Sequence, residues 1–191
     1  MSPRTKKQLD EIKKDKHGII LNAALIVFSE NGYHSASISK IAKTAEISKG
    51  LIYNYFESKE ALLNEIILSG LAKLTGFFNP NNDGFLTEDE FDLFLNSLTK
   101  IIKENISYWK LYYSVILQHS VLELLKEKIM EFTQGYFTIL INYFSRHNSK
   151  NPEAEAMLLT TTLDGLAIAY VNDPEQFPID EMIQLVIKKF K

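Results

Sequence analysis

Apolar residues recur three and four positions apart along almost the whole chain of 191 residues, and alternation with a period of two is scarce. In the first such segment, residues 16–31, this repeat places Ile20, Ala24, Val27 and Phe28 on one helical face. A helix with a single apolar face needs other helices to cover it. The pattern therefore predicts an all-α protein of about nine helices, with about three short ones in front and about six longer ones behind.

Capping residues and turn formers mark the ends of these helices. Ser37, Ser48 and Ser58 each stand directly before a predicted helix, where a hydroxyl accepts a hydrogen bond from a free backbone N–H. Asn31 and Gly32 end the first helix, because glycine readily adopts the left-handed conformation there. We expect helices over residues 16–31, 38–45, 49–56, 59–78, 88–102, 107–118, 121–146, 153–171 and 179–190.

Residues that carry catalysis or hold metals are absent or scattered in this sequence. The chain has no cysteine, which excludes disulfides, cysteine zinc sites and thiol nucleophiles. Its four histidines lack metal-ligand spacing, and it has neither a nucleophile elbow nor a glycine-rich phosphate loop. We therefore expect no enzyme activity, no metal and no cofactor. Without an uninterrupted run of ~18 apolar residues or an apolar signal core at the start, we also expect a cytoplasmic location and no membrane partner.

Charge is unevenly divided along the chain. Residues 1–60 carry ten Lys and Arg against seven Asp and Glu, whereas the remainder carries eleven against seventeen, which gives the net charge of −3. A basic front on an acidic body fits a nucleic-acid-binding head. An unevenly charged, solvated surface explains the same numbers.

Residues 37–55 have the pattern of two short helices joined by a tight turn at Glu46 and Ile47. The small residues Ala42 and Ala45 allow the two helices to cross closely. This is typical of a helix-turn-helix, whose second helix enters the major groove of DNA. Ordinary helical bundles also contain such pairs, so the spacing alone leaves a purely structural interpretation open.

The residues of this region resemble a known family. Residues 19–63, IILNAALIVFSENGYHSASISKIAKTAEISKGLIYNYFESKEALL, are similar to the DNA-binding head of TetR-type (tetracycline-repressor-like) transcriptional regulators. The residues that fit the family pattern are Phe28, Gly32, Tyr33, Ser37, Ile41, Ala42, Ala45, Ser48, Gly50, Tyr53, Tyr55, Phe56, Ser58, Lys59, Glu60 and Leu62. The chain departs from the pattern at Ala36, where threonine is usual, at Lys40, where an acidic residue is frequent, and at Glu46, where glycine is frequent.

The resemblance implies a set of DNA-contacting residues in this head. They are Ser37, Ser39, Lys40, Ser48, Lys49, Gly50, Tyr53, Asn54, Tyr55 and Lys59. The capping residues Ser37 and Ser48 would also touch phosphates, as hydroxyls and helix N-termini commonly do. Lys49 would reach a guanine edge or the DNA backbone. The hydroxyls of Tyr53 and Tyr55 would contact phosphates while their rings pack against the head.

Two further basic features flank the head. Lys59, at the start of the next helix, is expected to bind a phosphate together with the free N–H groups of that helix. Residues 1–15 are expected to form a flexible basic tail, which adds nonspecific DNA affinity, enters a minor groove or is simply solvated.

The resemblance also implies the organisation of the whole chain. We expect a helix-turn-helix DNA-binding domain over residues 16–60 and an effector-binding and dimerisation domain over residues 61–191. Residues 154–171 are apolar almost all round, so more than one face must be covered. A homodimer formed through the last two helices would cover them and would match a palindromic operator in double-stranded DNA. An intrachain core is the alternative.

The effector would be a small molecule bound in the body. Candidate pocket residues combine an apolar body with a polar tip, although core residues also have this character. These candidates are Trp109, Tyr112, Gln118, His119 and Tyr136. The sequence thus predicts a ligand-responsive repressor that an apolar or aromatic effector releases from DNA.

Two other functions fit parts of the sequence. Residues 79–90, NPNNDGFLTEDE, follow the spacing of an EF-hand calcium loop, but Asn stands at the first position and no partner loop follows. We therefore favour an ordinary turn with a T-x-x-E capping box for this segment. A calcium-responsive protein, or a helical protein-interaction module without DNA, therefore remains as an alternative.

Overall fold

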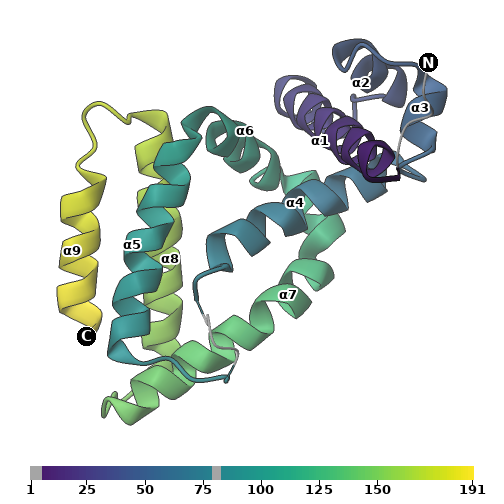
Figure 1. The fold of residues 1–191 in the computed structure, drawn as a ribbon. Helices are drawn as coiled ribbons and strands as arrows, with labels where there is room; N and C mark the ends of the chain where they lie inside the picture. Colours follow the sequence, from purple (N-terminus) through teal and green to yellow (C-terminus); the bar gives the residue numbers. More distant parts are fainter. Residues whose placement is uncertain (1–5, 79–82) are drawn as a thin grey trace. The chain divides into compact units, whose positions relative to one another are not determined.

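The computed structural model describes residues 6–78 and 83–191 (Figure 1). Within these ranges the protein is all-α, as predicted, with nine helices and no strand. The helices are α1 (Lys6–Asn31), α2 (Ile38–Thr44), α3 (Lys49–Tyr53), α4 (Lys59–Thr75), α5 (Glu88–Glu104), α6 (Ile106–Ile116), α7 (His119–Arg146), α8 (Pro152–Asn172) and α9 (Ile179–Phe190).

Helix α1 begins at Lys6, ten residues before the predicted start. Residues 6–15 are mainly Lys, Gln, Leu, Asp, Glu and Ile, and most of these types favour a helix even without an apolar face to bury. Periodicity alone therefore placed the start too late. The helix ends at Asn31, and the φ of +74° at the following Gly32 is the left-handed conformation that glycine adopts without strain. Residues 1–5 of the predicted tail lie outside the described residues.

The chain packs into two compact units. The first unit comprises the chain up to Leu68 together with Ser114–Leu125, and the second comprises Ser69–Tyr113 and Lys126–Lys191. Three helices, α4, α6 and α7, contribute residues to both units. The predicted division at residue 60 concerns functional domains and stays a proposal.

The core of the first unit joins α1 to the two short helices. Ile20 and Phe28 of α1, Ile41 of α2 and Ile52 of α3 are fully buried. Because α2 and α3 are too short to be stable alone, this shared core is what holds them in place.

In the second unit, α5, α8 and α9 lie side by side (Figure 1). Phe91 and Leu95 of α5, Leu159 of α8 and Ile183 of α9 are buried in their common core. Rings stack in the same core, with Phe91 and the Tyr143 ring of α7 at 4.9 Å between centroids and nearly parallel. These helices therefore bury their inner faces without a partner chain.

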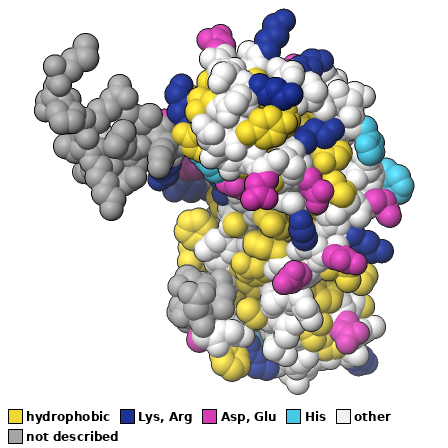
Figure 2. All heavy atoms as spheres, turned by 90° about the vertical axis from the view of Figure 1, so that its right-hand side faces the viewer, with side chains coloured by type: hydrophobic (Ala, Val, Ile, Leu, Met, Phe, Trp, Pro, Cys, Tyr) yellow, Lys and Arg dark blue, Asp and Glu magenta, His cyan; other side chains and the backbone are white. Residues whose placement is uncertain are grey.

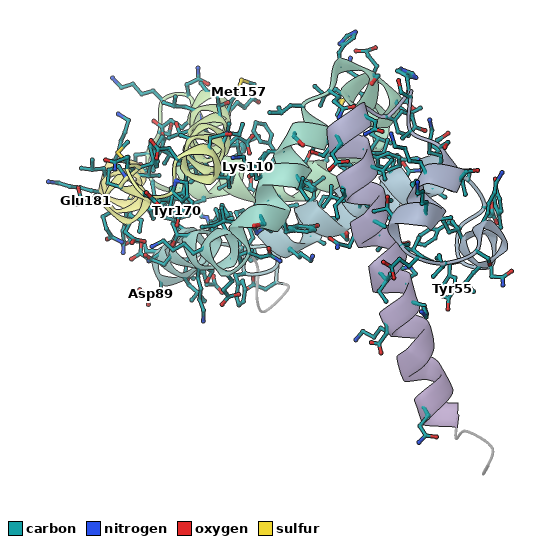
Figure 3. All side chains as sticks on the ribbon, turned by 90° about the horizontal axis from the view of Figure 1, so that it is seen from above. Tyr55, Asp89, Lys110, Met157, Tyr170 and Glu181 are labelled. Carbon is teal, nitrogen blue, oxygen red and sulfur yellow. The ribbon has the colours of Figure 1, made fainter. Side chains whose placement is uncertain are left out.

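The outer face of α8 is apolar and exposed. Met157 is 62% exposed and Leu158 51%, and Leu185 on the neighbouring α9 is 60% exposed. Figure 3 labels Met157 on α8. Within the described ranges, α8 is the one helix that is long and apolar enough to cross a membrane by length and composition alone, and a third of that stretch is buried.

The segment with calcium-loop spacing forms a turn and a helix cap in its described part. Thr87 and Glu90 form a capping box, in which the Glu90 carboxylate accepts hydrogen bonds from the Thr87 N–H and hydroxyl, both at 2.9 Å. Asp83 accepts a bond from the Phe85 N–H at 2.8 Å. The candidate ligands Asn79 and Asn81 lie outside the described residues. Among the residues that are described, no group of three or more His, Asp and Glu side chains is arranged to hold a metal ion.

One glycine in the second unit marks a close approach of α4 and α6. A Cβ added at Gly70 would overlap the ring of Tyr112, which is itself almost fully buried. Gly70 thus lets the ring lie directly against the α4 backbone. Gly135 on α7 has open space around it and is exposed, so it offers a matched comparison.

We expect Gly70→Ala to lower the free energy of unfolding by about 1–3 kcal/mol, because the added methyl overpacks the Tyr112 ring. Gly135→Ala should instead raise it by about 0.5–1 kcal/mol through helix propensity. Urea denaturation measures both changes. In a Tyr112→Ala background the Gly70→Ala penalty should disappear, and a penalty of unchanged size would contradict the proposed overlap.

Candidate DNA-binding interface

The helix-turn-helix is built from two short helices with serine caps. Ser37 precedes α2 and accepts the Lys40 N–H at 3.2 Å, and Ser48 precedes α3 and accepts the Leu51 N–H at 3.2 Å. Both serines have the extended backbone conformation usual for an N-cap. The caps therefore fix where each helix begins, and both serine side chains remain exposed.

The turn between α2 and α3 contains a residue with positive φ. Glu46 has a φ of +53°, which is the left-handed region that disfavours side chains other than glycine. The turn is closed by the Ile47 N–H, which donates to the Ala42 carbonyl at 3.0 Å. The departure from glycine noted in the sequence thus carries a conformational cost at this position.

Most of the predicted DNA-contacting residues lie on the exposed side of the head. Among the ten, all but Tyr55 and Lys59 are exposed, namely Ser37, Ser39, Lys40, Ser48, Lys49, Gly50, Tyr53 and Asn54. Tyr53 is 50% exposed although its ring is large and apolar. The Lys49 ammonium lies 5.9 Å from the centre of that ring. The structure thus gathers cationic and hydroxyl groups on the solvent side of α3, opposite the buried Ile52.

Lys43 belongs to the same exposed surface, but sequence analysis did not include it. It lies three residues after Lys40, so the two share one face of α2 and both are exposed. This i, i+3 spacing of basic residues is the signal that would have found it. Figure 2 shows several Lys and Arg side chains at the top of the view, where Figure 1 places the head.

Tyr55 is half-buried beside α1. Its ring lies 6.3 Å from the His17 ring, and His17 stacks on Phe56 at 5.0 Å. The His17 Nε2 atom is 2.9 Å from a carboxylate oxygen of Glu65 on α4. These contacts hold the segment after α3 against α1. Tyr55 therefore packs with its ring, as expected, and its contact with phosphate stays a prediction.

Lys59 makes contacts within the head that sequence analysis did not predict, and its contact with phosphate stays a prediction. Its ammonium donates to three backbone carbonyls of the α1–α2 turn, those of Tyr33 at 2.7 Å, His34 at 3.1 Å and Ala36 at 2.9 Å. It also lies 4.4 Å from the centre of the Tyr33 ring. Burial lowers the pKa of Lys59. Because an ammonium has three N–H donors, these bonds use all of them.

The five candidate pocket residues do not come together in one unit. Trp109 and Tyr112 are buried neighbours in the second unit, with ring centres 5.3 Å apart. The Trp109 indole N–H donates to the Ile101 carbonyl at 3.0 Å, so its polar tip is satisfied inside the protein. Tyr136 is half-buried and its ring lies 5.4 Å from Phe78. Ligand binding by these three residues stays a prediction.

Gln118 and His119 belong to the first unit. His119 is exposed at the start of α7. The Gln118 amide contacts the head, since its Oε1 accepts the Tyr33 N–H at 2.9 Å and its Nε2 donates to the Phe28 carbonyl at 3.1 Å. Sequence analysis did not predict these contacts, because the sequence shows nothing of a partner ninety residues away. Ligand binding by Gln118 and His119 stays a prediction.

Two capped short helices on an apolar core, with the second helix exposed and cationic, define a helix-turn-helix DNA-binding protein. A family model described as bacterial regulatory proteins, tetR family, matches residues 20–66. The chain belongs to this TetR family of bacterial regulatory proteins.

Two curated relatives show how far the similarity extends. The HTH-type transcriptional regulator UidR of Escherichia coli strain K12 is 48% identical over 65 residues, which cover 34% of this chain and 33% of UidR. That match spans only about a third of the relative's length. The fatty acid metabolism regulator protein of Bacillus subtilis strain 168 is 33% identical over 134 residues, which cover 67% of this chain and 66% of that protein.

Solved structures with the same fold cover nearly the whole chain. The transcriptional regulator FadR of Bacillus subtilis, solved in complex with stearoyl-CoA, has a TM-score of 0.72 at 22% identity, over 91% of this chain and 96% of that chain. The fatty acid degradation regulator FadR of Bacillus halodurans has a TM-score of 0.71 at 24% identity, over 92% of this chain and 94% of that chain. At these identities the likeness establishes the fold.

We expect Glu46→Gly to raise the free energy of unfolding by about 1 kcal/mol, because glycine adopts the positive φ of the turn without strain. Thermal and urea denaturation measure the change. Glu46→Ala serves as the control and should stay within about 0.5 kcal/mol of the natural protein, since alanine keeps the strain. An equal gain in both variants would show that the charge of Glu46, and not its backbone conformation, is unfavourable.

Proposed function

We propose that this regulator is a cytoplasmic repressor that binds a palindromic operator as a homodimer and is released by a small-molecule effector. The observation that carries the proposal is the exposed polar face of α2 and α3 opposite a fully buried apolar face. Each head would place α3 in one major groove, with Lys49 and Tyr53 toward the DNA. The capping serines Ser37 and Ser48 would add phosphate contacts.

The homodimer is supported by the uncovered apolar surface of the second unit. Met157, Leu158 and Leu185 expose large apolar side chains on two adjacent helices. On α8, exposed residues recur at 154, 157, 158, 161, 164 and 165, which is the spacing of one continuous helical face, and Asp164 is the one charged residue among them. Alanine, threonine and glycine on this face permit close helix packing. Two copies of α8 and α9 would bury it in a four-helix interface.

The class of effector is supported by the relatives. The Bacillus subtilis relative that matches two thirds of this chain is a fatty acid metabolism regulator. The Bacillus subtilis FadR structure holds stearoyl-CoA. We therefore assign to this chain an effector with a long apolar chain, which agrees with the aromatic core around Trp109 and Tyr112. A fatty acyl thioester such as stearoyl-CoA is the compound to test first.

We expect Lys49→Ala to weaken operator binding by about tenfold or more, because it removes a charge-assisted contact to a base or phosphate. Tyr53→Phe should weaken it by about fivefold through loss of one hydroxyl contact. Gel shifts with the DNA upstream of the protein's own gene measure both, and the natural protein's affinity should fall steeply as salt rises.

Lys150→Ala is the matched control for this experiment, because Lys150 is an exposed lysine in the α7–α8 loop. It should leave operator affinity unchanged. Unchanged affinity in both Lys49→Ala and Tyr53→Phe would refute the assigned DNA contacts. Addition of stearoyl-CoA to the natural complex tests the effector, and an operator complex that persists at saturating ligand would refute that assignment.

We expect Leu158→Glu to raise the dimer dissociation constant at least about tenfold, because association would bury an unpaired carboxylate. Sedimentation equilibrium measures the change. Leu93→Glu is the control, since Leu93 is similarly exposed but lies on α5. If the natural protein sediments as a monomer, or if both variants dissociate alike, the assigned interface is wrong.

A further inference from the structure

The turn between α1 and α2 is held by side chains from two other segments. The Tyr33 N–H donates to Oε1 of Gln118 at 2.9 Å, and the Tyr33 carbonyl accepts from the Lys59 ammonium at 2.7 Å. Both backbone groups of one residue are thus bound by distant side chains, one from the α6–α7 turn and one from the start of α4.

The Gln118 amide spans this turn in one defined orientation. Its Nε2 donates to the carbonyls of Phe28 at 3.1 Å and Ser114 at 3.2 Å, while its Oε1 accepts from Tyr33. A backbone N–H only donates and a carbonyl only accepts, so these partners settle which amide atom is oxygen and which is nitrogen. A neighbouring hydrogen bond joins the hydroxyls of Ser29 and Ser114 at 2.8 Å.

Gln118 lies at a point in the chain that connects this contact to helices of the second unit. It lies between α6 (Ile106–Ile116) and α7 (His119–Arg146), and both helices continue into the second unit. Its backbone carbonyl accepts the N–H groups of Val121 and Leu122, at 2.9 and 3.0 Å, and so begins α7. Gln118 therefore contacts the head with its side chain and begins α7 with its backbone. The later residues of α7 belong to the second unit.

We infer that Gln118 is a positioning residue that couples the head to the body. It holds the α1–α2 turn, through Tyr33, in the geometry that binds DNA. A rearrangement of α6 or α7 withdraws the amide and releases that turn. The inference rests on the proposed function. It identifies the contact through which ligand binding in the body would alter the DNA-binding surface. Coupling is reciprocal, so DNA bound at the head must also stabilise the start of α7.

Hydrogen exchange of the full-length protein with and without operator DNA tests this reciprocity without a known effector. In the natural protein, operator binding should slow exchange of the Val121 and Leu122 amides by about fivefold or more. In Gln118→Met, which keeps side-chain length and loses all three hydrogen bonds, this protection should vanish. Operator affinity should also fall by about three- to tenfold in that variant.

Two variants separate coupling from a general loss of stability. Gln134→Met makes the same substitution at an exposed position of α7, and Ser29→Ala removes only the neighbouring hydroxyl bond. Both should retain the protection at Val121 and Leu122 and bind the operator within about twofold of the natural protein. Circular dichroism confirms that each variant is folded.

The possible failures are distinguishable. If the natural protein binds no DNA upstream of its gene, the proposed function fails and the inference fails with it. If the natural protein binds DNA and Gln118→Met shows the same protection at Val121 and Leu122, Gln118 is merely structural and only the inference is overturned. Loss of protection in Gln134→Met as well would also overturn it, because the effect would then not be specific to the amide.

Discussion

The apolar core shared by α1, α2 and α3 is the constraint on which the DNA-binding surface depends. Helices of five and seven residues do not persist in water without tertiary contacts. Ile41 and Ile52 are fully buried where α2 packs on α1 and α3 packs on α2, and this burial forces the opposite faces of α2 and α3 into solvent. The exposed Lys49 and Tyr53 thus follow from the burial of Ile52, because a helix that buries one face presents the other.

Backbone carbonyls near the end of α1 explain the contacts of the Lys59 and Gln118 side chains. The end of α1 and the following turn leave carbonyls without helical partners, and such groups need hydrogen bonds when they are partly buried. Lys59 binds three of these carbonyls, and Gln118 adds a bond to the Phe28 carbonyl, which also accepts the Gly32 N–H. The head is therefore completed by residues that sequence analysis assigned to phosphate and to ligand.

The second unit exposes an apolar surface that bears on how the protein assembles. Its inner core of α5, α8 and α9 is buried within one chain, yet Met157, Leu158 and Leu185 remain outside. Large apolar patches on a protein surface mark sites of interaction. The same helix satisfies the length and composition of a membrane span, and its exposed apolar face is the surface that the proposed dimer would cover.

The sequence by itself determined the helical class, most helix boundaries and the helix-turn-helix, because apolar spacing and serine caps are local signals. It missed the early start of α1, where propensity rather than periodicity forms the helix, and it did not predict the backbone partners of Lys59 and Gln118. Only the tertiary structure decided that both side chains meet at Tyr33. The physical reason is that a hydrogen bond between residues 26 or 85 positions apart leaves no local pattern, since it depends on how the helices pack.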